Sequence, residues 1–252
     1  MSARIRTLAL VVRRVDYSNS SQVVTLSTRE RGLVRAIAKG IHRPGQLAFS
    51  GPFDLGVLYE VVYVPRRAPA MGILTESAVI DAHRGLRADL GRHAAALAVI
   101  EILGSVGTED EPQPDLFDLA AGTLGAIEAA GPELPLVFFL IRALEAIGLQ
   151  LRLDACAECG AALPAAGPAH LSLRLGGILC PRCRGEDPGA RPVRGSTIRL
   201  WAALARSRLS RIDRVELEPV DVRRVARLVR DAWIFLLERR LRSLEYVEGL
   251  KI

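Results

Sequence analysis

Long uninterrupted hydrophobic runs are absent from this chain of 252 residues. The longest apolar stretches, at residues 94–103 and 134–141, contain or adjoin charged residues, and both are far shorter than the roughly 18 residues that span a bilayer. The first residues also lack the apolar core of a secretion signal, because Arg13 and Arg14 interrupt the stretch that begins at Leu8. We therefore expect a cytoplasmic protein with no membrane partner.

The motifs of common catalytic sites are also lacking. The sequence contains no Walker lysine motif, no G-x-S-x-G nucleophile and no H-E-x-x-H zinc site. None of its four histidines begins the H-x-E of the zinc deaminases, and the carboxylates show no clustering suited to a metal-dependent nuclease. We expect no catalytic residues, no enzymatic activity and no small-molecule substrate.

Cysteine is scarce, and all four cysteines fall into one pattern. Two C-x2-C pairs, separated by twenty residues, are formed by Cys156, Cys159, Cys180 and Cys183. This spacing is typical of a structural zinc site, in which each pair turns two thiolates toward one ion. A catalytic zinc site usually includes a histidine, and none lies beside either pair. Disulfides or metal-free thiols are the alternatives, although a chain that is long enough to bury a full hydrophobic core does not need disulfide cross-links for stability.

Lysine is nearly absent, since only Lys39 and Lys251 among 34 basic residues are lysines. Codon bias explains this preference for arginine, but it does not explain how charge is distributed. Residues 1–80 carry a net charge of +6, residues 81–151 carry −7, and residues 152–252 carry +7. Two basic segments around an acidic middle favour a polyanionic partner for the ends of the chain.

The first eighty residues have the pattern of β-structure. Polar or glycine-containing turns separate apolar-rich runs that predict five strands, at residues 8–14, 22–28, 33–39, 53–64 and 71–80. Five short strands with one long connection fit a small barrel of the OB type, and a β-meander without a binding role is the alternative. We expect residues 1–80 to form an OB-fold domain.

Helical periodicity begins after residue 81. Apolar residues recur at three and four positions, and prolines and glycines separate the predicted helices, at residues 82–103, 115–130, 133–147, 197–206 and 220–241. The predicted fold is therefore multidomain, with the β-barrel followed by an all-α domain at residues 81–252. A four-cysteine zinc module at residues 154–190 interrupts this domain.

Basic residues on the strands and loops of the predicted barrel are candidates to bind DNA phosphates. They are Arg13, Arg14, Arg35, Lys39, Arg43, Arg66 and Arg67. Scattered surface arginines without a common role are the alternative. The same segment offers aromatic residues that could stack on bases, namely Tyr17, Phe49, Phe53, Tyr59 and Tyr63. Phe53 and Tyr59 lie in an apolar strand and are expected to pack in the core.

A second set of arginines lies near the C-terminus. Most of its members share one face of a predicted helix, opposite several valines, and they are Arg223, Arg224, Arg227 and Arg230. They form a candidate second DNA contact, and an ordinary solvated face is the alternative.

Several segments, in their order, resemble the RecO family of bacterial recombination mediators. The N-terminal segments are residues 23–28, 32–40 and 52–53, and the C-terminal ones are residues 139–148, 176–180 and 240–244. Each segment alone is weak evidence for the resemblance, whereas the order of the segments along the chain is specific to the family. The turn at residues 17–21 departs from the family because it lacks an expected Gly-Glu, and the linker after the first cysteine pair is longer than usual.

The resemblance implies a non-enzymatic, nucleoid-associated DNA repair mediator with structural zinc. It would bind single- and double-stranded DNA, anneal complementary strands, contact RecR and the single-strand-binding protein SSB, and help RecA load onto SSB-coated DNA. Arg35 and Lys39 match the family's motif, and a pocket for the SSB tail is expected in the helical domain. The alternatives are a zinc-stabilised protein-interaction scaffold with incidental nucleic-acid binding, and a hydrolase or nuclease that uses the metal.

Overall fold

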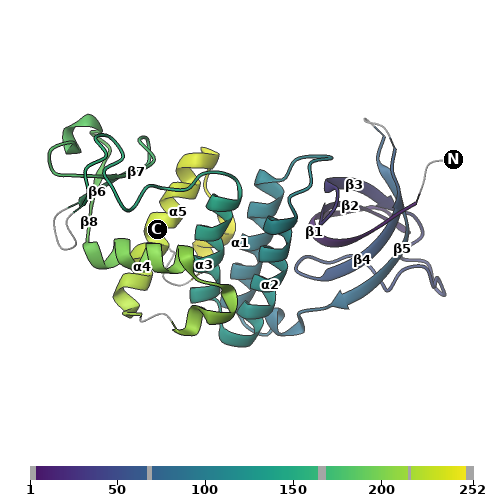
Figure 1. Cartoon of the computed structure of the whole chain (residues 1–252). Coiled ribbons are helices and arrows are strands. Elements are labelled where there is room, and N and C mark those ends of the chain that lie inside the picture. Colours follow the sequence, from purple (N-terminus) through teal and green to yellow (C-terminus); the bar gives the residue numbers. More distant parts are fainter. Residues whose placement is uncertain (1–3, 67–69, 164–168, 215–216, 248–252) are drawn as a thin grey trace. The chain divides into compact units, whose positions relative to one another are not determined.

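The fold is taken from a computed structural model, which describes residues 4–66, 70–163, 169–214 and 217–247. The chain divides into two compact units, residues 1–132 and 133–252. The first unit contains the barrel and two helices, and the second contains three helices and the cysteine-bearing module (Figure 1).

A closed five-stranded barrel forms the N-terminal part of the first unit, with strand order β1-β2-β3-β5-β4. The strands are β1 (Ile5–Ser18), β2 (Ser21–Thr28), β3 (Gly32–Ala38), β4 (Leu58–Val64) and β5 (Gly72–Asp81). All neighbours are antiparallel except β3 and β5, whose parallel pairing closes the barrel. This arrangement confirms the predicted OB-like barrel.

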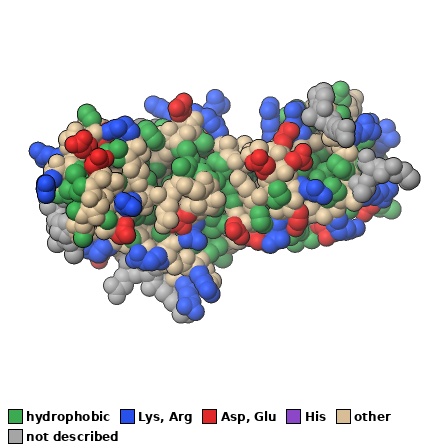
Figure 2. Space-filling model, turned by 45° about the horizontal axis from the view of Figure 1, so that its top comes forward, with side chains coloured by type: hydrophobic (Ala, Val, Ile, Leu, Met, Phe, Trp, Pro, Cys, Tyr) green, Lys and Arg blue, Asp and Glu red, His purple; other side chains and the backbone are tan. Residues whose placement is uncertain are grey.

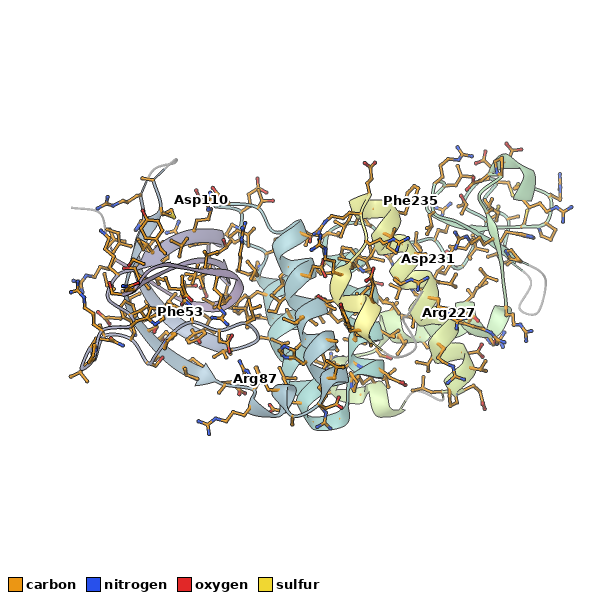
Figure 3. The ribbon with its side chains drawn as sticks, turned by 180° about the vertical axis from the view of Figure 1, so that it is seen from behind. Phe53, Arg87, Asp110, Arg227, Asp231 and Phe235 are labelled. Carbon is orange, nitrogen blue, oxygen red and sulfur yellow. The ribbon has the colours of Figure 1, made fainter. Side chains whose placement is uncertain are left out.

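Alternating side chains fill the barrel. Along β3, Val34 and Ala36 are buried, whereas Arg35 between them is exposed, because successive side chains in a strand point to opposite faces. Phe53 and Tyr59 are buried in the barrel core, as predicted, with their ring centroids 4.9 Å apart. Phe53 lies inside the barrel in Figure 3. Strand β4 begins at Leu58, five residues later than predicted, because residues 53–57 form a loop with a turn at residues 55–56.

Two helices complete the first unit, α1 (Leu90–Val106) and α2 (Pro114–Ala130). Helix α1 packs on β1, and at Gly104 an added Cβ would lie 3.4 Å from Val12. The helix predicted from residue 82 begins later, because residues 84–87 form a short 3-10 helix, η1. Asp89 then caps α1 by accepting the backbone N–H of Arg92 at 2.9 Å.

The helices of the second unit are α3 (Glu133–Ala146), α4 (Gly195–Arg206) and α5 (Pro219–Leu237). Trp233 of α5 is fully buried, and its Nε1 donates to the carbonyl of Leu140 in α3 at 2.9 Å. The predicted end of the last helix, residue 241, is wrong. Glu238 adopts a left-handed conformation with φ 51°, and the chain beyond it turns to bury Leu241 and Leu244.

The module that interrupts these helices contains a small antiparallel sheet in the order β7-β6-β8. Its strands are β6 (Ala169–Ser172), β7 (Gly177–Leu179) and β8 (Arg191–Val193). These strands were not predicted, because three or four residues are too few to show a period of two. Within the described ranges, no helix is both long and apolar enough to cross a membrane.

Candidate metal centre and nucleic-acid interface

The four cysteines lie on two tight turns of the module. In the first turn, the N–H of Gly160 donates to the carbonyl of Cys156 at 2.9 Å. In the second, the N–H of Cys183 donates to the carbonyl of Cys180 at 3.0 Å. Cys156 and Cys180 are buried, and Cys159 is exposed. Each turn thus contributes one buried thiol and one more exposed thiol to the same cluster.

The spacing of the sulphur atoms fits one tetrahedral ion. All four Sγ atoms lie within 4.8 Å of one another, and those of Cys159 and Cys180 are 3.9 Å apart. A zinc ion with four bonds of about 2.3 Å holds neighbouring sulphurs about 3.8 Å apart. A disulfide would require about 2.05 Å, and all four cysteines are free. The residues present therefore fit a four-thiolate metal site.

The electrostatics of the site favour one thiolate before any ion binds. Burial alone would raise the pKa of Cys156, but the backbone N–H groups of Cys159, Cys180 and Glu158 lower that pKa to about 6. Hydrogen bonding to Cys159, together with burial, raises the pKa of Cys183 to about 12. An ion that binds here would displace protons from the remaining thiols.

Asp187 connects the second cysteine turn to the small sheet. Its carboxylate accepts the hydroxyl of Ser172 and, at 3.0 Å, the N–H of Gly189. The hydroxyl of Ser172 lowers the pKa of Asp187 below its usual range, with further lowering from Gly189 and Arg174. These bonds hold the cysteine turns on the sheet.

The barrel brings two of the predicted basic residues into one row across three strands. Arg13 of β1 pairs with Thr25 of β2, and Thr25 pairs with Arg35 of β3. Residues opposite each other in adjacent strands share a face, so the two guanidinium groups flank Thr25 on the outer wall. A register shift between Val11 and Arg13 produces this alignment. Both arginines are exposed.

Further basic and aromatic side chains lie toward the tip of the same strands. Ser18 pairs with Ser21 and Gln22 pairs with Ala38, which places Tyr17 and Lys39 at one end of the sheet. The backbone N–H of Arg43 donates to the carbonyl of Gly40 at 3.0 Å, so Arg43 lies just beyond Lys39. We call this set the barrel surface, and it consists of Arg13, Tyr17, Arg35, Lys39 and Arg43.

Tyr17 is the exposed member of the five candidate aromatic residues, at 69%. The other four are buried in the barrel core, and they are Phe49, Phe53, Tyr59 and Tyr63. Burial raises the pKa of both Tyr59 and Tyr63. A flat ring beside cations can stack on a base without reading its sequence.

Of the other predicted barrel residues, the structure describes Arg14 and Arg66, and only Arg14 points away from this surface. Arg14 turns away from Arg13, and its Nε lies 3.3 Å from a carboxylate oxygen of Asp54. Arg66 is exposed and lines a hollow of about 190 Å³ together with Arg35, beside the acidic Asp110. Arg67 lies outside the described residues.

The arginines of α5 differ in their partners. Arg224 donates to Asp221 at 2.9 Å, and Arg230 donates to Asp231 at 2.8 Å. Arg223 and Arg227 are exposed. Figure 3 shows Arg227 and Asp231 on this helix, and basic and acidic side chains lie interspersed over the face seen in Figure 2. Two of the four candidate arginines on α5 are therefore already held by carboxylates.

The second unit contains a groove whose residues were not predicted from the sequence. It encloses about 1190 Å³ between the C-terminal half of α3, residues 149–154 and α4. Buried apolar side chains form its floor, and arginines line it. The floor includes Ile141, Leu144 and Trp201, and the arginines include Arg152, Arg206 and Arg208. These residues come from three separate segments, so no local motif indicates the groove.

Two family models match almost the whole chain. Residues 1–83 match "Recombination protein O N terminal", and residues 87–245 match "Recombination protein O C terminal". The chain belongs to the RecO family. The family assignment, the barrel and the clustered cysteines confirm the resemblance seen in the sequence.

RecO relatives from three bacteria align over nearly the full chain. "DNA repair protein RecO" of Anaeromyxobacter dehalogenans (strain 2CP-C) is 35% identical over 239 residues, covering 94% of this chain and 92% of the relative. The protein of the same name from Exiguobacterium sibiricum is 32% identical and covers 96% and 95%. The Bacillus subtilis (strain 168) protein is 29% identical and covers 96% and 94%. This RecO-family chain is therefore a DNA repair protein.

Proposed function

We propose that this protein is a non-enzymatic recombination mediator that binds single- and double-stranded DNA through the barrel surface. The observation that carries the proposal is the row of Arg13, Thr25 and Arg35 on the outer wall, with Lys39 beyond it. Among the residues that the structure describes, Arg13, Arg35 and Lys39 have no ion-pair partner. Exposed cations without carboxylate partners can neutralise DNA phosphates and release their counterions.

The arrangement fits a mediator better than a sequence-specific binder. The barrel surface offers charge and a single exposed ring, Tyr17, but it presents no helix to a major groove. Such a surface can hold DNA strands by their backbones irrespective of sequence, which annealing of complementary strands requires. We assign the main DNA contact to residues 1–80. We assign the partner contacts, and a weaker second DNA contact at Arg223 and Arg227, to residues 81–252.

For the partner SSB, we propose the groove between α3 and α4 as the binding site. The apolar floor around Trp201 can bury hydrophobic side chains, and the arginines can pair with carboxylates of a bound segment. Charge reversal at Arg152 and Arg206 should weaken binding of SSB and leave binding of naked DNA unchanged. We further propose that RecR acts together with this protein to load RecA onto SSB-coated single strands.

We propose that zinc is the structural cofactor of the four cysteines, as their geometry supports. Bound zinc would supply no step of the function and would hold the two cysteine turns together. Zinc content near one ion at this site, with no cleavage of DNA in Mg²⁺ or Mn²⁺, would count against a metal-dependent hydrolase.

The test is fluorescence anisotropy with a labelled oligonucleotide, followed by RecA loading on SSB-coated single strands with and without RecR. A mediator binds the oligonucleotide and accelerates RecA loading when RecR is present. A protein-interaction scaffold, the alternative function, would bind partners with no measurable affinity for the oligonucleotide at moderate salt. That outcome would overturn the proposal.

A further inference from the structure

A second group of metal-ligating side chains lies in the first unit, outside the surfaces described above. Asp81 is the last residue of β5, His83 follows two residues later, and Glu128 lies in the last turn of α2. Their ligand atoms all lie within 4.8 Å of one another. The group therefore joins the end of the barrel to a helix that begins more than thirty residues later in the chain.

The separations in this group match those between ligands of one metal ion. His83 Nδ1 lies 3.4 Å from Asp81 Oδ1 and 3.4 Å from Glu128 Oε2. A strong hydrogen bond between an imidazolium and a carboxylate would be shorter, at about 2.7–2.9 Å. Ligands of a tetrahedral zinc ion, with bonds of about 2.0–2.1 Å, lie about 3.3 Å apart. The distance from the imidazole nitrogen to each carboxylate oxygen thus matches the distance between two ligands of one tetrahedral ion.

Backbone groups hold both carboxylates in place. The N–H of His83 donates to Asp81 Oδ1 at 2.9 Å, and the N–H of Gly85 donates to Glu128 Oε1 at 2.6 Å. Gly85 permits this close approach, because a Cβ there would lie 2.8 Å from Glu128 Oε1. The second oxygen of Glu128 is left facing the imidazole. Outer hydrogen bonds of this kind orient metal ligands in proteins.

The imidazole itself is nearly removed from solvent. His83 is 4% exposed, and its Nε2 has no hydrogen-bond partner within the described part of the chain. Its backbone is left-handed, with φ 40°. The Asp81 side chain is 53% exposed, so ions and water reach the group from the side of Asp81.

We propose that Asp81, His83 and Glu128 bind a divalent first-row transition-metal ion such as Zn²⁺ or Mn²⁺. One imidazole nitrogen and two carboxylate oxygens form a ligand set that suits these ions, whereas the four thiolates of the other site select zinc. Three protein ligands leave a coordination position for water on the exposed side. The ion would fasten strand β5 to helix α2 and so stiffen the junction that follows the DNA-binding barrel.

The direct test is zinc stoichiometry of the full-length protein after equilibrium dialysis against ZnCl₂, measured by mass spectrometry. The variants are His83→Asn, which keeps a residue that tolerates left-handed backbone, and Glu128→Gln. His93→Asn is the matched control, since His93 lies in the same unit outside the group. Each variant should bind one zinc ion fewer than the wild type, and the control should equal the wild type. Equal stoichiometry in the wild type and both variants would overturn the proposal.

A second measurement separates this site from the cysteines by the choice of metal ion. Mn²⁺ prefers oxygen and nitrogen ligands to thiolates, so adding MnCl₂ should raise the melting temperature of the wild type and of Cys180→Ser. It should leave that of Glu128→Gln unchanged. If His83→Asn does not fold, Glu128→Gln decides the question, because Glu128 is 32% exposed and glutamine retains an oxygen for Gly85. If MnCl₂ raised the melting temperature of Glu128→Gln as much as that of the wild type, the three residues would be a hydrogen-bonded group and not a metal site.

Discussion

The arginines of the barrel and those of the second unit have the same charge but different neighbours. Arg13 and Arg35 lie on a rigid sheet and have no carboxylate partner within the described residues. On α5, Arg224 is held by Asp221, and Arg230 is held by Asp231. The difference predicts that the number of basic residues in a region is a poor measure of its affinity for DNA. What matters is how many cations are free to exchange water for phosphate.

The largest effect that separates the two regions should come from Cys180→Ser. Loss of one thiolate should abolish zinc binding at this site and destabilise the second unit, lowering its melting temperature by roughly 10 °C or more. DNA affinity should stay near that of the wild type, because the barrel surface lies in the first unit. Zinc content, thermal melting and anisotropy measure these effects. Wild-type melting without zinc would show that the ion is dispensable for folding.

The next largest effect should come from Arg35→Ala with Lys39→Ala on the barrel. Removal of two charged phosphate contacts, each contributing roughly 1–1.5 kcal/mol, should lower DNA affinity by roughly 30- to 150-fold. Anisotropy with labelled single and double strands gives the affinity, and circular dichroism should confirm that the fold is unchanged. Undiminished affinity at moderate salt would remove these residues from the DNA interface.

Tyr17→Ala should produce a smaller loss, and chiefly on single strands. Stacking of one base on an aromatic ring contributes about 1–3 kcal/mol, so affinity for single-stranded DNA should fall about fivefold or more. Duplex DNA, whose bases are already stacked, should bind almost as before. Tyr246→Ala is a matched control, since Tyr246 is 62% exposed and lies in the second unit. An equal loss for both DNA forms would argue against stacking.

The smallest effect should come from Arg223→Ala with Arg227→Ala on α5. These two exposed arginines should contribute as a second DNA contact worth about two- to threefold in affinity, because neighbouring carboxylates weaken the local potential. The same anisotropy titration measures this change beside the barrel double variant. A loss of DNA affinity as large as that caused by Arg35→Ala with Lys39→Ala would show that the barrel and α5 do not differ in their contribution to DNA binding.

Much of the fold could be predicted from the sequence, because the information was local. The barrel strands show clear alternation between turns, and the cysteine spacing alone indicated one site. The pairing of Arg224 with Asp221 could also have been predicted, since the two residues are three apart on a helix.

Other features depend on tertiary structure and have no local signal. The row of Arg13, Thr25 and Arg35 requires the strand register and the irregularity after Val11. The groove beside Trp201 is formed by three separate segments. His83 and Glu128 are 45 residues apart in the sequence, and only the packing of α2 brings them together.

The central claim, that the barrel surface contacts DNA phosphates, is tested most directly by the salt dependence of binding. Each phosphate contact contributes about −0.9 to the slope of log affinity against log salt on duplex DNA. Arg35→Ala with Lys39→Ala should therefore make the slope shallower by about 1.8. A slope and an affinity equal to those of the wild type, across the whole salt range, would contradict the account.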